Sequence, residues 1–202
     1  MEQLDGRPRI YLAGKITNKS WRKVIESGGK EFCLDSYERN NLESVYFADK
    51  DQYYNYEYET EDYIITGPHS LSCDHGCFHR GIHAATSYDE CGDLVELEPD
   101  ADICVDDVIR ACCSQIDRSD LVFAYIDSLN AYGTFAEIGY AFGKGKKIYI
   151  IVENEYMLDQ LWFLVIMACQ SGGWCTYNHA ETAKDYILRN FNNMLEENKK
   201  KK

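Results

Sequence analysis

From residue 104 onward, short apolar runs alternate with segments of helical period, and this alternation restricts the possible folds more than any other feature. The runs LVFAYID (121–127) and KIYIIVE (147–153) are continuously apolar and have the length of a strand. Before them, the stripe from Val105 through Ile109 and Cys112 to Ile116 repeats at helical spacing. Strands without polar alternation are buried on both faces, which is typical of parallel sheets covered by helices. The sequence therefore predicts an α/β fold.

Further segments extend the same pattern to both ends of the chain. The runs RIYLAG (9–14), YIITG (63–67) and WCTY (174–177) are expected to be strands, and residues 134–143 and 158–169 are expected to be helices. A last helix is expected near the end of the chain. Together they predict a Rossmann-like or flavodoxin-like parallel sheet of about five strands with helices on both faces.

The length of 202 residues fits one domain covering residues 1–202. Within it, the polar and Tyr-rich segment 39–62 shows no clear period, and we interpret it as an insertion or long loop. Residues 84–103, which are rich in Asp and Glu, are also expected to be irregular.

Charge and cysteine usage restrict the partners and the compartment. The formal charge of -13 repels phosphate backbones, so we expect no nucleic-acid polymer as a ligand, whereas a few local donors can still hold one nucleotide. No secretory signal is visible, and the longest apolar run, 161–169, is too short to span a membrane. We therefore expect a cytoplasmic protein whose nine cysteines are reduced.

In parallel sheets of this kind, the ligand site lies beyond the carboxyl ends of the strands. That rule selects the segments Gly14–Thr17, Pro68–His83 and Asp127–Glu137. In the third segment Glu137 stands one turn into a helix, within GTFAEIGYA. A carboxylate at that place can attack an electrophilic carbon or stabilise a cationic one, as glycoside-bond chemistry requires. The alternative is a structural Glu that the helix dipole favours.

Three stretches resemble the nucleoside 2-deoxyribosyltransferase superfamily, which includes the deoxynucleoside 5′-monophosphate N-glycosidases. They are IYLAG in the first strand, DLVFAYID in a central strand and AYGTFAEIGYAFGKGKKIYIIV, so the similarity covers the start of the chain and residues 104–178. The resemblance implies that Glu137 is the nucleophile that takes the sugar from the base. It also implies an enzyme without a cofactor that acts on a nucleoside or nucleotide.

The sequence departs from that family at two supporting carboxylates. The family has an Asp on the helix before the central strand, where this chain has Cys112, and its transferases have a second Asp where this chain has Ala131. Asp127, at the end of its strand, is the residue that we expect to replace the second one. The residues expected to bind substrate are Tyr11, Gly14, Lys15, Thr17, Arg22, Gly133, Thr134, Tyr140, Gln160 and Trp162.

A Cys- and His-rich stretch, HSLSCDHGCFHRGIH (69–83), follows the second predicted strand. It has three interpretations: a substrate-facing loop, a zinc site, or a turn with buried thiols. As a substrate loop it presents Asp74 and His75, either of which can donate a proton to the departing base. As a metal site it offers Cys73, Cys77 and His79, although their spacing is not that of a zinc finger.

The segment LDQLWFLVIMAC (158–169) is apolar nearly all round, which indicates either a core helix or a subunit interface and hence a homo-oligomer. The leading hypothesis is an enzyme that transfers a (deoxy)ribosyl group between bases through a glycosyl ester on Glu137. The alternatives are a nucleoside 5′-monophosphate N-glycosidase, which passes the sugar to water, and a nucleotide-binding module without catalysis. A zinc-stabilised scaffold is a further alternative.

Overall fold

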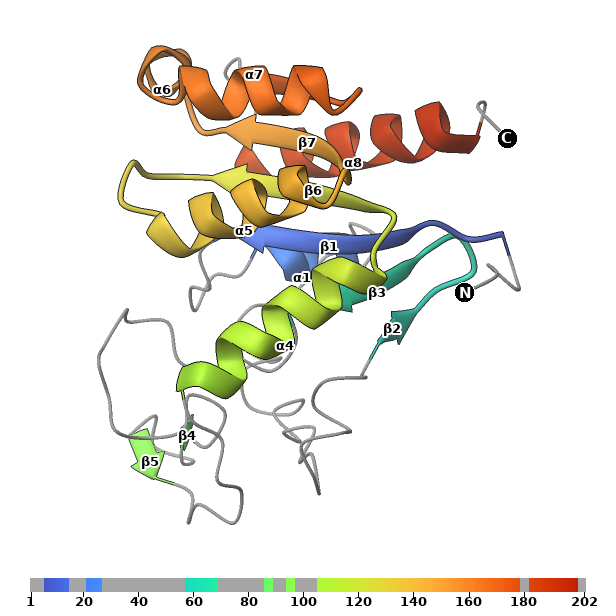
Figure 1. The fold of residues 1–202 in the computed structure, drawn as a ribbon, viewed down its shortest axis with the longest axis vertical. Coiled ribbons are helices and arrows are strands. Elements are labelled where there is room, and N and C mark those ends of the chain that lie inside the picture. Colours follow the sequence, from blue (N-terminus) through green and yellow to red (C-terminus); the bar gives the residue numbers. More distant parts are fainter. Residues whose placement is uncertain are drawn as a thin grey trace.

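The computed structural model describes residues 6–14, 21–26, 57–68, 86–88, 94–96, 105–178 and 182–199 (Figure 1). Strands and helices follow one another along the chain in the order β1 (Arg9–Gly14), α1 (Arg22–Glu26), β2 (Tyr58–Glu59), β3 (Ile64–Gly67), β4 (Thr86–Tyr88), β5 (Leu94–Glu96), α4 (Val105–Arg118), β6 (Leu121–Ile126), α5 (Tyr132–Gly143), β7 (Lys147–Val152), α6 (Glu155–Gln160), α7 (Trp162–Gln170), β8 (Trp174–Tyr177) and α8 (Ala183–Lys199).

A six-stranded sheet in the order β2-β3-β1-β6-β7-β8 forms the centre of the molecule. β2 is antiparallel to β3, and the other five strands run parallel to one another. Numbered in chain order, those five parallel strands have the 2-1-3-4-5 arrangement of a flavodoxin-like sheet. The predicted α/β class is therefore confirmed, with β2 added as an antiparallel edge strand.

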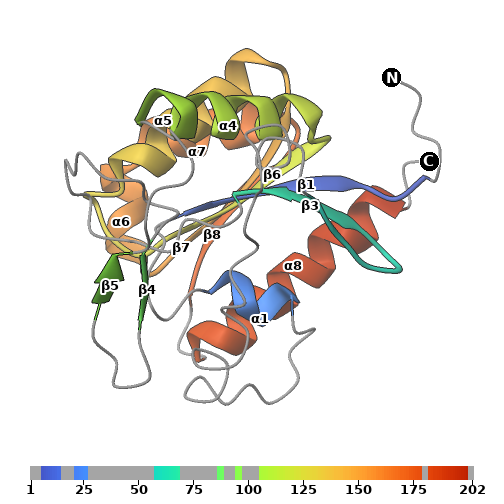
Figure 2. The ribbon, with the colours of Figure 1, turned by 90° about the horizontal axis from the view of Figure 1, so that it is seen from below.

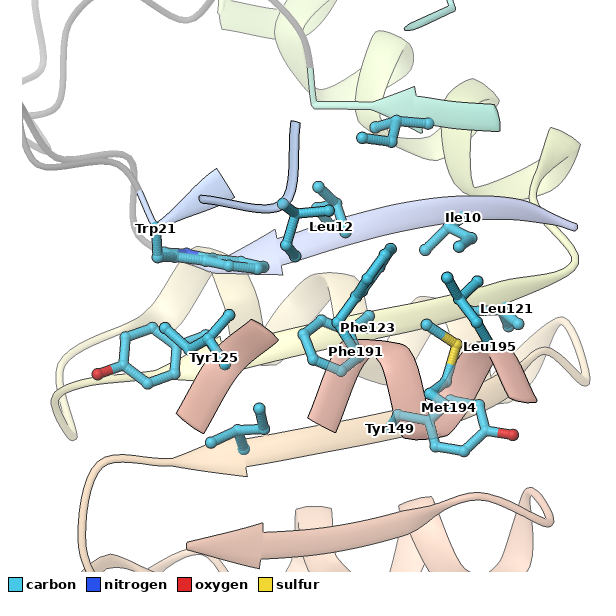
Figure 3. Packing of buried hydrophobic residues seen from close by; sticks show 14 of the residues in the cluster. Ile10, Leu12, Trp21, Leu121, Phe123, Tyr125, Tyr149, Phe191, Met194 and Leu195 are labelled. Carbon is cyan, nitrogen blue, oxygen red and sulfur yellow. The ribbon is translucent and has the colours of Figure 1, made fainter. Parts of the chain in front are cut away.

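Helices cover both faces of the sheet, as predicted (Figure 2). α4, α5 and α7 lie on one face, and α1 and α8 lie on the other. Each strand residue faces one of these two layers because successive side chains alternate. The side of α8 is filled by aromatic and aliphatic side chains, among them Phe123, Phe191 and Met194 (Figure 3). The other layer packs smaller residues such as Ala124 and Ile138 under α4 and α5.

Several elements differ in detail from the sequence-based expectation. The segment 39–62 contains the edge strand β2, and the segment 84–103 contains the antiparallel pair of β4 and β5. The single helix expected over 158–169 is two helices, because Leu161 ends α6 with φ -105° and ψ 22° and its carbonyl then accepts from Val165 at the start of α7. Neither Gly nor Pro marks that break in the sequence, so the helical period runs through it.

The buried face of α4 is also rotated from the predicted stripe. Ala111, Gln115 and Ile116 are buried, whereas Ile109 is 58% exposed. The prediction that Ile109 faces the core is therefore wrong, because hydrophobicity at helical spacing fits two neighbouring faces of this helix. Among the described helices, none combines the length and the apolar character that crossing a membrane requires.

The strand order reverses between β1 and β6, which lie side by side with Gly14 opposite Tyr125. A ligand crevice is expected at this point, beyond the carboxyl ends of the strands. Gly14 ends β1 in a crowded place. A Cβ atom there would lie 2.7 Å from Trp21 Nε1 and 2.8 Å from the carbonyl oxygen of Tyr125. Only glycine lets these three segments approach so closely.

Candidate active site

Glu137 lies on the inner side of α5, the helix that follows β6. Thr134, Ile138 and Ala141 are the buried residues of that helix, and Glu137 is partly buried beside them. Helical spacing places Glu137 next to Thr134 and Ala141, so its carboxylate points under the helix toward β1 and α4. The acidic group flagged in the sequence is thus held inside the fold.

Tyr11, in the middle of β1, is the direct partner of this carboxylate. Its side chain is fully buried, and its hydroxyl donates a hydrogen bond of 2.6 Å to Oε1 of Glu137. Burial and the negative charge of Glu137 raise the pKa of the Tyr11 hydroxyl well above its ordinary value. The hydroxyl therefore keeps its proton and is a permanent donor to the carboxylate.

Cys112, on α4, completes the immediate surroundings. Its thiol interacts with both the Tyr11 hydroxyl and the Glu137 carboxylate. Burial, with the charge of Glu137 as the next cause, raises the pKa of the Cys112 thiol to about 12. The thiol is therefore protonated at neutral pH and is a second neutral neighbour of Glu137, without nucleophilic character of its own.

Burial is also the dominant influence on Glu137, whose pKa it raises from 4.5 to about 7. The Tyr11 hydrogen bond, the charge of Arg22 and the Cys112 thiol act in the opposite direction and favour the ionised form. Burial therefore shifts Glu137 toward the protonated form, and its three polar neighbours shift it back toward the ionised form.

Arg22 is the cation that acts on Glu137, and it is held firmly from α1. It is 5% exposed, and it donates from Nε to the carbonyl of Leu12 at 2.9 Å and from Nη2 to the carbonyl of Gly14 at 2.5 Å. Its guanidinium also lies 5.0 Å from the centre of the Trp21 ring. These contacts tie α1 to the end of β1 and place a fixed positive charge at the carboxyl end of that strand.

A second polar group stands at the carboxyl ends of β6 and β7. The Tyr125 hydroxyl makes a short hydrogen bond to Glu153, the residue after β7. Asp127, directly after β6, is exposed, and its carboxylate accepts from the Ser128 hydroxyl at 2.9 Å. Both carboxylates therefore lie at the carboxyl edge of the sheet, at the ends of two neighbouring strands, where ligand sites of such sheets are expected.

The other predicted substrate-binding residues of α5, α6 and α7 are in varied places. Gly133 is exposed, whereas Thr134 is buried on the inner side of α5. The Tyr140 hydroxyl lies 3.1 Å from an oxygen of Asp117, at the far end of α4, so it is engaged away from Glu137. Gln160 and Trp162 are both exposed, at the junction of α6 and α7.

Seven predicted site residues lie outside the described part of the chain. They are Lys15, Thr17, Cys73, Asp74, His75, Cys77 and His79. Within the described ranges, no group of three His, Cys, Asp or Glu side chains is arranged to hold a metal ion.

Two residues of the site were not selected from the sequence. The sequence marks Cys112 only as the occupant of a position where the resembling family has a carboxylate, and Glu153 is not among the residues predicted from it. Glu153 carried a usable signal, since it follows KIYIIV in the way that Asp127 follows LVFAYI. Cys112 carried no such signal, because a lone cysteine in an apolar helical stripe is normally a small core residue.

Comparison of the chain with protein-family models, with curated proteins and with solved structures gives no match. A partly buried carboxylate between a tyrosine hydroxyl and a thiol, under the carboxyl edge of the sheet, can form a bond to an electrophilic carbon or accept a proton.

Proposed function

We propose that the protein is an N-glycosidic-bond enzyme that transfers a (deoxy)ribosyl group of a nucleoside or nucleotide, with Glu137 as its nucleophile. The observation that carries the proposal is the 2.6 Å hydrogen bond from the buried Tyr11 hydroxyl to the Glu137 carboxylate, beside the point where the strand order reverses. This bond fixes the orientation of the carboxylate within the fold. The resemblance of GTFAEIGYA to the deoxyribosyltransferase superfamily supports the same role.

In the first step, a carboxylate oxygen of Glu137 forms a bond to C1′ of the sugar while the C1′–N bond to the base breaks. The bonding electron pair leaves with the base, which takes up a proton. In the second step, a nitrogen of an acceptor base forms a bond to C1′ and gives its proton to the group that protonated the departing base, while the ester bond breaks and its electron pair returns to the Glu137 carboxylate. Poor solvation of the buried carboxylate favours the attack, because the raised pKa reflects an oxygen that water stabilises weakly. No cofactor is needed for this displacement.

The proton for the departing base needs a separate donor. Tyr11 and Cys112 hold their protons too tightly for this task at neutral pH, since the pKa of each is strongly raised. Asp127 lies at the carboxyl edge of the sheet, directly after β6, and Asp74 and His75 are the further candidates that the sequence offers. We assign the proton transfer to this group.

The charge of the chain supports a small-molecule substrate. At -13 the protein attracts neither a nucleic-acid polymer nor an anionic membrane surface. The Nε and Nη2 atoms of Arg22 already donate to Leu12 and Gly14, so binding of a 5′-phosphate falls to Lys15 and Thr17. The cysteine usage supports a cytoplasmic site of action.

The test is incubation of the protein with each nucleoside and each 5′-monophosphate, with and without an acceptor base, followed by chromatography. Exchange of the base supports the transferase, and a free sugar product supports the N-glycosidase. Glu137→Gln and Glu137→Ala should both abolish base release, while Glu197→Gln, on the exposed side of α8, should leave it unchanged. A glycosyl adduct on Glu137 should appear in intact-protein mass spectra of the wild type only.

Base release that survives both Glu137 substitutions contradicts the proposed nucleophile. Calorimetric binding of a nucleotide without any product contradicts the enzyme and favours the binding module.

A further inference from the structure

The immediate neighbours of Glu137 bear on which kind of base can leave the sugar. Tyr11 donates to the carboxylate at 2.6 Å, and the Cys112 thiol interacts with the same carboxylate. Both neighbours are neutral and retain their protons at neutral pH, because burial and the charge of Glu137 raise the pKa of each. The carboxylate is therefore enclosed by groups that orient it without giving a proton to a departing base.

The charge balance of the first step differs between two classes of base. With a neutral base, the negative charge of the Glu137 carboxylate passes to the base, which then requires a proton. With a base that is a ring cation, the electron pair of the C1′–N bond neutralises the ring as the bond breaks. A carboxylate and a cation then give a neutral ester and a neutral base, and no proton is transferred.

Burial of Glu137 favours the second class. Loss of water raises the pKa of Glu137 from 4.5 to about 7, so the ionised carboxylate is poorly solvated inside the fold. A step that removes both the negative and the positive charge relieves this cost. A step that moves the negative charge to a neutral base keeps one charge in the same poorly solvated place. The buried carboxylate therefore suits a cationic base better than a neutral one.

The carboxyl edge of the sheet also attracts a cation. Asp127 directly follows β6, Glu153 directly follows β7, and Glu155 begins α6 (Figure 1). Asp127 and Glu155 are exposed, so their charges act on a ligand that approaches this edge. Arg22 carries the opposite charge, but its Nε and Nη2 atoms donate to backbone carbonyls of β1. The charge of -13 on the whole chain acts in the same direction as the three carboxylates.

We infer that the preferred substrate is a nucleoside or nucleotide whose base is a ring cation, that is, a pyridinium or a purine alkylated on the ring. The inference rests on the proposed reaction at Glu137 and specifies the base that this reaction releases most readily. An oxygen of Glu137 forms a bond to C1′, the C1′–N bond breaks, and its electron pair stays on the ring nitrogen. Neutral bases still depend on a proton donor at the carboxyl edge, so they should leave more slowly.

The test compares substrates that differ only in the charge of the base, with the full chain as the enzyme. The pairs are guanosine with 7-methylguanosine and 2′-deoxyguanosine with its 7-methyl cation, each followed by chromatography at pH 6 after subtraction of spontaneous release. A general acid contributes on the order of 100-fold or more to release of a neutral base. The kcat/KM of the cationic member should therefore exceed that of the neutral member by at least about 100-fold. Glu137→Gln should abolish release from both members, and Glu197→Gln should preserve the preference.

A pyridinium riboside, whose charge does not titrate, gives the pH profile. Its kcat/KM should rise as Glu137 ionises near pH 7 and stay level up to pH 8.5, because no acid has to remain protonated. Comparable release from guanosine and 7-methylguanosine, or an alkaline fall in the pyridinium profile, overturns the inference and leaves the proposed function standing. Release from none of these substrates or of the neutral nucleosides and monophosphates overturns the proposed function as well.

Discussion

Glu137→Gln should make the folded protein more stable at alkaline pH, although it removes the proposed nucleophile. Glutamine keeps the size of the side chain and an oxygen that accepts from the Tyr11 hydroxyl, but it cannot ionise. In the wild type, burial raises the pKa of Glu137 from 4.5 to about 7. That difference corresponds to about 3 kcal/mol between the protonated and ionised forms.

The sign of the effect follows from proton linkage. Between pH 4.5 and 7, the unfolded chain has released the Glu137 proton and the folded chain retains it, so unfolding releases a proton. The free energy of unfolding contributed by Glu137 therefore falls as pH rises through this window, and it is constant above pH 7. The variant lacks this loss. The free energy of unfolding of the variant should exceed that of the wild type by almost nothing at pH 4.5 and by about 1 to 3 kcal/mol at pH 8.5.

Urea unfolding followed by tryptophan fluorescence measures this difference, because Trp21 is buried against Phe123 and Tyr125 and reports on the core. The unfolding free energies of wild type and variant should be compared at pH 4.5, 6, 7 and 8.5. The control variant Glu197→Gln, at an exposed position of α8, should differ from the wild type in free energy of unfolding by the same small amount at each pH. A Glu137→Gln variant with a constant difference from wild type, or with lower stability at pH 8.5, would refute a buried ionisable Glu137.

Three further perturbations probe the surroundings of Glu137. Tyr11→Phe removes the 2.6 Å hydrogen bond, so base release should fall roughly 100-fold and the midpoint of its pH profile should move to higher pH. Cys112, with a pKa of about 12, should react with iodoacetamide at pH 7.5 on the order of a thousandfold more slowly than a free cysteine, as measured by peptide mass spectrometry. Gly14→Ala forces a Cβ atom against Trp21 Nε1 and the Tyr125 carbonyl, and urea unfolding should show a loss of about 1 to 3 kcal/mol.

The sequence predicted the sheet well because its strands are unambiguous. LVFAYI and KIYIIV have no polar interruption, and a parallel strand buried on both faces is the structure that suits such a run. The same regularity located Glu137, since the helix after a central strand must begin at the carboxyl edge. The break at Leu161 was not predicted, because the backbone turn between α6 and α7 leaves no trace in composition or in helical period.

The partners of Glu137 were harder to predict for a different reason. Tyr11 and Glu137 are 126 residues apart, and only the register of β1 against β6 brings the hydroxyl under α5. Tyr11 was expected at the substrate, and the structure has it bonded to the carboxylate. The contact of Cys112 with Glu137 depends on which face of α4 is buried, and the apolar residues of α4 fit two neighbouring faces. Pairings set by tertiary packing are not encoded in any local spacing.

Burial of Glu137 lowers the stability of the fold at alkaline pH, and it also affects the proposed reactivity of the carboxylate. The same lack of water that favours the protonated form leaves the ionised carboxylate poorly solvated, which makes it a stronger nucleophile toward carbon. Tyr11 and Cys112 are neutral donors, so they orient the carboxylate and lower its pKa without adding a positive charge that would reduce its reactivity. A cation in direct contact would stabilise the ionised form further, but it would also reduce the reactivity of the oxygen. Burial raises the pKa of Glu137 to about 7, and Arg22, whose guanidinium is tied to Leu12 and Gly14, opposes that rise only in part. A site built for stability alone would place an uncharged residue at position 137, and the proposed reaction gives a reason for a carboxylate there.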